Sequence, residues 1–63
     1  MIKQGDKVKV RVDEAGKTRW LEGVVHDVKE TGQYIFDELQ VFIWVDTAEG
    51  RKMTTSYYGV TPI

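Results

Sequence analysis

The chain has no cysteine, and histidine, serine and proline each occur once among its 63 residues. The absence of cysteine excludes a disulfide framework, a thiolate metal site and a cysteine nucleophile, and it is typical of a reducing compartment. No apolar run approaches the length of a membrane span, and the N-terminal residues lack the apolar core of a signal peptide. We therefore expect a complete cytoplasmic protein with a single domain, residues 1–63, and no membrane partner.

Groups that carry out catalysis are scarce. His26 and Ser56 lie far apart in the sequence, whereas nucleophilic catalysis needs such groups within hydrogen-bond reach. On a strand His26 shares a face with Glu22, which predicts an exposed histidine beside a carboxylate. A zinc site needs three or four converging ligands, and the six glycines stand singly, so they form no phosphate loop. We expect no enzyme, no cofactor and no metal; an active site here would have to be shared between subunits.

Charge is balanced overall and uneven along the chain. The net charge is −1 and the isoelectric point is about 5.7. Residues 1–19 carry six cations against three acids, whereas residues 20–50 carry Lys29 alone against seven acids. We expect these segments to lie on adjacent strands, where opposite charges pair across the ladder. The alternative is a two-sided surface, basic on one edge and acidic on the other, that suits a polar partner.

Apolar residues alternate with polar ones and nowhere recur convincingly at helical spacing. Residues 7–12 predict a strand with its valines toward a core and its cations toward water. A second strand over residues 19–29 changes phase at Gly23, which predicts a bulge or a sharp bend there.

The rest of the chain also predicts short β elements. Residues 34–40 are ambiguous between a short strand and an apolar loop, and Pro62 restricts the last strand to a sheet edge. The predicted turns and strands are a turn at Gly16, a turn at Gly32, a strand over 40–46, a turn over 47–50, a strand over 51–56, a 3₁₀ turn over 57–59 and a strand over 60–63. The sequence thus predicts an all-β fold of about five strands.

This order resembles the Src-homology-3-like small barrels and, within them, the Tudor-like domains. The resemblance is carried by GDKVKVRV, by RWLEGVVHDV with its leading tryptophan, by VFIWVDTAEG and by YYGVTPI, and it covers nearly the whole chain. It implies a five-stranded barrel much more than an activity, since ribosomal, transcription-elongation, photosystem-subunit and phage proteins share the pattern. A small phage or bacterial accessory protein would suit it.

Residues 40–46, QVFIWVD, are apolar on both faces of the predicted strand. We expect Phe42 and Trp44 to lie outside the barrel wall. They would be covered either by the segment YIFDEL, with Tyr34, Phe36 and Leu39 folding back, or by another molecule. The residues expected to fill the interior are Val8, Val10, Val12, Val24 or Val25, Val28, Val41, Ile43, Val45 and Val60.

An uncovered aromatic pair on a protein surface usually marks an interaction site, so we expect a non-catalytic module that binds a protein partner or itself. Phe42 and Trp44 would supply the apolar anchor. The residues expected at its margin or giving orientation through charge are Trp20, Tyr57 or Tyr58, Lys9, Arg11, Arg51 and Lys52.

Two other functions fit parts of the pattern. Single-stranded nucleic acid would stack on Trp44 beside cations, although the acidic isoelectric point argues against this; the cations are Lys7, Lys9, Arg11, Arg51 and Lys52. In Tudor-like domains a cage of aromatic residues with an acid holds methylated ammonium groups by cation–π attraction, and the resemblance would assign that role to Trp20, Trp44 and Asp46. The first loop lacks the aromatic residue that such cages use. A packing role is the alternative for these aromatic residues, at the edge of the core for Trp20 and Phe42 and under the last turn for Tyr57 or Tyr58.

Overall fold

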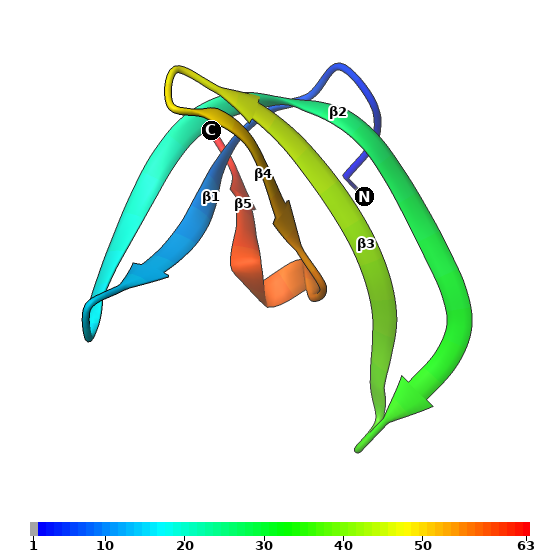
Figure 1. The fold of residues 1–63 in the computed structure, drawn as a ribbon. Helices are drawn as coiled ribbons and strands as arrows, with labels where there is room; N and C mark the ends of the chain where they lie inside the picture. Colours follow the sequence, from blue (N-terminus) through cyan, green and yellow to red (C-terminus); the bar gives the residue numbers. More distant parts are fainter. Residues whose placement is uncertain (1) are drawn as a thin grey trace.

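The computed structural model describes residues 2–63, which form five antiparallel strands and a 3₁₀ turn. The elements are β1 (Lys7–Glu14), β2 (Lys17–Ile35), β3 (Glu38–Thr47), β4 (Gly50–Thr54), η1 (Tyr57–Gly59) and β5 (Val60–Pro62). The strand order in the sheet is β4-β3-β2-β1-β5, and the sheet is strongly curved, with η1 beneath its arch (Figure 1). The predicted all-β class is confirmed. No helix among residues 2–63 is long and apolar enough to cross a membrane.

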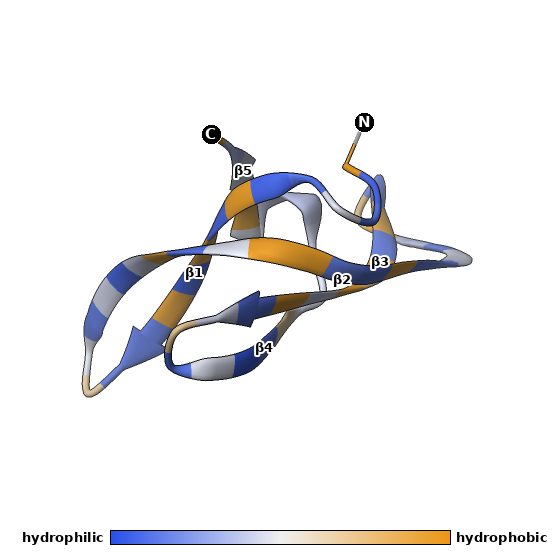
Figure 2. Ribbon diagram, turned by 90° about the horizontal axis from the view of Figure 1, so that it is seen from above, coloured by the Kyte–Doolittle hydropathy of each residue, from blue (hydrophilic) through white to orange (hydrophobic). Residues whose placement is uncertain are grey.

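Strand β1 forms where the valines and cations alternate, and Figure 2 shows the alternating hydrophobic and hydrophilic bands along it. Val8 and Val10 are fully buried, whereas Val12 is only half-buried near the strand end. Of the two candidates at the bend, Val25 is buried and Val24 is exposed. The buried core consists of Val8, Val10, Val25, Val41, Ile43, Val45 and Val60.

Strand β2 is one long bent strand, and its first bulge lies at a different residue from Gly23, the position predicted for a bulge or a bend. The ladder to β3 shifts register between Val25 and Asp27, so the extra residue is His26 and not Gly23. Gly23 is required for another reason. A Cβ at this position would lie 2.7 Å from Val45 Cγ1 and closer still to the Asp46 carbonyl, so the glycine lets β3 approach β2 closely at this point.

The predicted turn at Gly32 is wrong. Gly32 has φ of +77° and lies inside β2, in a second register shift between Glu30 and Tyr34. The Thr31 hydroxyl donates to the Gln40 carbonyl at 2.9 Å and accepts from the Gln33 amide, so these side-chain bonds replace missing ladder bonds and the chain continues as a strand. The chain reverses at Phe36 and Asp37. The segment 34–40, which was ambiguous in the sequence, therefore forms the end of the β2–β3 hairpin.

The C-terminal elements follow the predicted order. Strand β4 begins at Gly50, one residue earlier than predicted, and ends at Thr54. The Ser56 side chain caps η1 by accepting from the Tyr58 amide at 3.1 Å, and its hydroxyl also donates to the Glu38 carboxylate of β3. These bonds hold η1 against the sheet. Strand β5 pairs only with β1 and is an edge strand, as Pro62 predicts.

Candidate interaction surfaces

Two aromatic rings of β3 lie on the face of the sheet opposite the core. Phe42 and Trp44 stack with ring centroids 6.0 Å apart and planes inclined by 27°, because alternate residues of a strand point to opposite faces. Met53 of β4 lies opposite Trp44 in the ladder and is 53% exposed. We call Phe42, Trp44 and Met53 the outer aromatic surface.

The hairpin end does not cover this surface. The Phe36 side chain is 99% exposed and that of Tyr34 is 67% exposed, so neither ring packs on Phe42 or Trp44. Leu39 packs against the core from the other face. The expected cluster of Tyr34, Phe36 and Leu39 does not form, because β2 and β3 stay paired up to Ile35 and Glu38 and the segment cannot fold back. Phe42, 37% exposed, remains open to a partner.

Three polar side chains border Trp44. Arg51 Nε donates to Asp46 Oδ1 at 2.7 Å, and His26 Nδ1 lies 3.4 Å from Asp46 Oδ2. The hydrogen bond from Arg51 lowers the pKa of the Asp46 carboxyl below its usual value. His26 is exposed beside a carboxylate as predicted, but the carboxylate is Asp46 and not Glu22, because the bulge at His26 breaks the parity of β2. The outer aromatic surface is thus bordered by fixed, mutually paired charges.

A shallow hollow of about 200 Å³ lies beside the indole of Trp44. It is lined by His26, Asp27, Trp44 and Arg51. A partner side chain that enters this hollow would contact an aromatic face on one side and charged groups on the other.

Trp20 lies apart from the outer aromatic surface. It is opposite Arg11 near one end of β2, whereas Trp44 is opposite Asp27, so much of the bent strand separates the two indoles. The carboxylate of Asp46 is already bound by Arg51. The structure does not assemble a cage from Trp20, Trp44 and Asp46.

The predicted orienting cations are also dispersed. Lys7, Lys9 and Arg11 follow one face of β1, where Lys9 is opposite Glu22 and Arg11 pairs with Asp13 at 3.5 Å. Lys52 lies opposite the buried Val45, on the other face from Arg51, and with Arg11 it lines a hollow of about 310 Å³ between β1 and β4.

One ion pair joins the basic segment 1–19 to the acidic segment 20–50, in part as the charge distribution predicted. Arg19 of β2 binds Glu49, in the turn after β3, through two hydrogen bonds of 3.1 Å. This bidentate contact raises the pKa of Arg19 and lowers that of the Glu49 carboxyl. The three arginines, Arg11, Arg19 and Arg51, each lie within 4 Å of a carboxylate, so these cations do not form a uniform positive surface.

The two tyrosines of η1 separate. Tyr58 is 77% exposed, whereas Tyr57 points under the arch and packs against the core. Its hydroxyl donates to Glu30 Oε1 at 2.8 Å, and burial together with this bond raises the pKa of Tyr57. Tyr57 therefore belongs to the inner side of the sheet and not to the margin of the outer aromatic surface.

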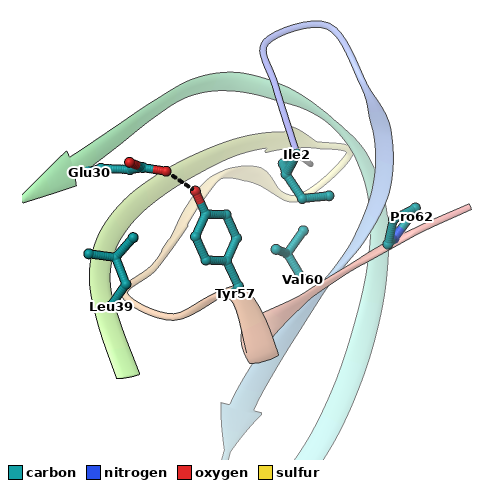
Figure 3. A pocket seen from close by; sticks show the side chains of 6 residues that line it. All are labelled: Ile2, Glu30, Leu39, Tyr57, Val60 and Pro62. Atoms are coloured by element: carbon teal, nitrogen blue, oxygen red, sulfur yellow. Dashed lines mark hydrogen bonds between the residues drawn. The ribbon is translucent and has the colours of Figure 1, made fainter. Parts of the chain in front are cut away.

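Tyr57 lines an open, mainly apolar pocket of about 470 Å³ on the concave side of the sheet (Figure 3). We call it the inner pocket, and its lining residues are Ile2, Glu30, Leu39, Tyr57, Val60 and Pro62. Sequence reasoning missed it because its walls come from both ends of the chain and from the hairpin. One signal was present: Glu30 shares strand parity with the inward Val28, and a polar group at an inward position needs a partner.

Comparison with known proteins identifies no relative: the chain matches no family model, no curated protein and no solved structure.

Proposed function

We propose that this protein is a non-catalytic interaction module of the cytoplasm that binds a protein partner through the outer aromatic surface. The observation that carries the proposal is the stacked pair Phe42 and Trp44, which stands on the solvent side of β3 with no segment folded over it. Phe42 is 37% exposed and Trp44 is half-buried, so the pair forgoes part of the apolar burial that a small domain makes available. A partner that covers the two rings would supply this missing burial and so offset the lost free energy.

The chemistry around the pair suits a protein surface. Trp, Tyr and Arg are the residue types enriched at binding hot spots, and Met is enriched at interfaces. An aromatic side chain buries about 150–250 Å² when covered, so the outer aromatic surface would form the centre of an interface. Arg51 and Asp46 would lie at the rim of the interface. Because they already form an ion pair with each other, placing them there would cost little free energy.

Within this proposal the fold is a Src-homology-3-like barrel of Tudor-like type. Support comes from the strand order β4-β3-β2-β1-β5, from the 3₁₀ turn directly before the last strand, and from the strong bend of β2, which pairs with β1 along its first half and with β3 along its second. Lys9 and Arg11 of β1 would act at a distance, by orienting the partner through charge.

The test compares three versions of the protein immobilised as bait: the unchanged chain, Trp44→Ala and Trp44→Phe. A protein captured from host extract is purified and titrated against each version by calorimetry. We expect Trp44→Ala to weaken binding at least about 30-fold, which is the scale of a hot-spot residue of about 2 kcal/mol, and Trp44→Phe to retain most of the affinity.

Thermal unfolding of the same variants separates a binding role from a packing role. The proposal expects Trp44→Ala to keep the cooperative unfolding transition. A large fall in the melting temperature with unchanged affinity would assign Trp44 to the core and refute the proposal.

Single-stranded nucleic acid is the alternative ligand. Arg11 lies opposite Trp20 in the ladder, which places a cation beside an exposed ring. The pairing of Arg11 with Asp13 weakens this case. Retention on single-stranded DNA or RNA that falls steeply with salt would support it, and no retention at low salt would exclude it.

A further inference from the structure

His26 is the extra residue of the first bulge in β2, and its imidazole lies between two charged side chains of the neighbouring strands. Its Nδ1 atom is 3.3 Å from Nη2 of Arg51 and 3.4 Å from Oδ2 of Asp46. Bulges often re-aim a side chain in this way. One nitrogen atom therefore faces a guanidinium, which can only donate hydrogen bonds, and a carboxylate, which when ionised can only accept them.

The protonation state of Nδ1 determines which of the two side chains it binds. Without a proton, Nδ1 accepts a hydrogen bond from Arg51, whose Nε also donates to Asp46 Oδ1 at 2.7 Å. With a proton, Nδ1 donates to Asp46 Oδ2, and the imidazolium repels the guanidinium. Protonation therefore exchanges one partner of His26 for the other.

The exchange falls in an accessible pH range. Histidine is the side chain whose charge ordinarily changes between about pH 5 and pH 8. Asp46 stays ionised there, because the hydrogen bond from Arg51 lowers the pKa of its carboxyl below the usual value, and an arginine stays protonated. His26 is also the only histidine in the sequence.

The elements packed around the bulge contribute other charges. From the segment before β1 and from β1, β2, β3 and β4 in turn, these charged residues are Asp6, Lys7, Asp27, Asp46 and Arg51. Carboxylates, lysines and arginines ordinarily keep their charge between about pH 5 and pH 8. A change of charge at this site in that range therefore comes from the imidazole.

The site adjoins the outer aromatic surface. His26 and Arg51 line the hollow of about 200 Å³ that also contains the indole of Trp44. While Nδ1 is unprotonated, hydrogen bonds to His26 and Asp46 both hold the guanidinium beside Trp44. Once Nδ1 is protonated, one of these bonds is lost and a second cation lines the hollow. The shape and the charge of the hollow therefore change together.

We propose that His26 is a pH-sensitive switch that sets the position of Arg51, and with it the form and charge of the hollow beside Trp44. Near the upper end of the range Arg51 is held by Nδ1, and near the lower end the imidazolium binds Asp46. Control of a partner by this switch rests on the function proposed above, whereas the switch itself is a property of the isolated chain.

The test is an NMR titration of the isolated chain from about pH 8 to about pH 5. At the upper pH, the imidazole nitrogen shifts should show the proton on Nε2 and none on Nδ1, because Nδ1 accepts from Arg51. On acidification, the indole N–H of Trp44 and the Nε–H of Arg51 should shift with the same midpoint as the imidazole. Trp20 lies apart from the hollow, so its indole N–H is the internal control and should not follow this midpoint.

Two variants separate the switch from a general response to pH. His26→Gln keeps a polar side chain without a titrating group, so the shifts at Trp44 and Arg51 should be lost. This variant also excludes the α-amino group, which titrates near the upper end of the range. Asp46→Asn removes the carboxylate that both Arg51 and the imidazolium bind, so the shift at Arg51 should be lost while the imidazole still titrates. Thermal unfolding should remain cooperative in both variants, because all of the exchanged side chains are exposed.

Three results would overturn the proposal. They are a proton on Nδ1 at the upper pH, an imidazole that titrates without shifts at Trp44 and Arg51, and a shift at Arg51 that persists in either variant. None of these results depends on a partner, and the affinity of Trp44→Ala for a partner does not depend on them. The switch and the proposed function can therefore be refuted separately.

Discussion

The β2–β3 pair contains two regions of similar apolar content and opposite burial. In the body, where Val25 and Val28 face Val45 and Ile43, the inward side chains are buried or packed against the core. At the tip, Tyr34, Ile35 and Phe36 are exposed. The difference is what lies across from each region: β1, β5 and η1 close the concave side of the body, whereas nothing in residues 2–63 opposes the tip. Whether a hydrophobic residue of this pair is buried thus depends on which distant elements pack across from it and not on its position in an apolar strand.

The same substitution in the two regions gives the largest contrast. Ile43 is fully buried, and Ile43→Ala should destabilise the fold by about 2–5 kcal/mol through lost burial and a cavity. Ile35→Ala should change the stability by less than about 0.5 kcal/mol. Urea unfolding at low micromolar concentration measures both. Because a small domain starts from a stability of only about 5 kcal/mol, Ile43→Ala is expected to be partly unfolded at 37 °C. Similar values for the two variants would show that the tip is covered in solution.

Two glycines of β2 extend the comparison from side chains to the backbone. Gly23 is in the body, where an added Cβ would collide with Val45 and with the Asp46 carbonyl. Gly23→Ala should therefore cost about 1–3 kcal/mol, since β3 must move. A Cβ at Gly32 meets nothing within 4 Å, but φ is +77°, so Gly32→Ala should cost about 1–2 kcal/mol from backbone strain alone.

The two glycine variants differ in which further substitution rescues them. Gly32→Asn, which tolerates positive φ, should recover part of the loss, whereas Gly23→Asn should be worse than Gly23→Ala. Equal rescue at both positions would contradict the close approach of β3 to Gly23.

The smallest expected effect is a pH dependence of the stability, which arises from Asp46 in the body of the β2–β3 pair. The pKa of Asp46 is lowered by its hydrogen bond with Arg51, so the ionised carboxylate stabilises the fold above the unfolded value of about 3.8. This contribution is lost as the pH falls through the lower pKa of the folded state. Thermal unfolding from pH 6 to pH 2 should therefore show a shallower decline for Asp46→Asn than for the unchanged chain. An identical slope would show that the Arg51 contact is not populated in solution.

Local pattern and tertiary contact decided different parts of the candidate sites. The alternation in QVFIWVD was sufficient to predict that Phe42 and Trp44 face away from the valine-lined interior, because side-chain direction in a strand has a period of two residues. It was not sufficient to predict what covers them. The turn at Phe36 and Asp37 was missed because Phe36 is not a residue type that such turns favour and no glycine follows at the second position. The assignment of His26 to Glu22 failed because a single bulge residue reverses parity.

By itself, the order of residues determined the five strands, the 3₁₀ turn and most of the buried set, since strand alternation and turn chemistry act over a few neighbouring residues. Only the tertiary structure decided that Tyr57 turns inward to Glu30, that Ile2 and Pro62 form one pocket with Leu39, and that Phe36 stands alone at the end of a hairpin. These features depend on which distant segments meet, and the free energy of such contacts is not encoded in any local periodicity.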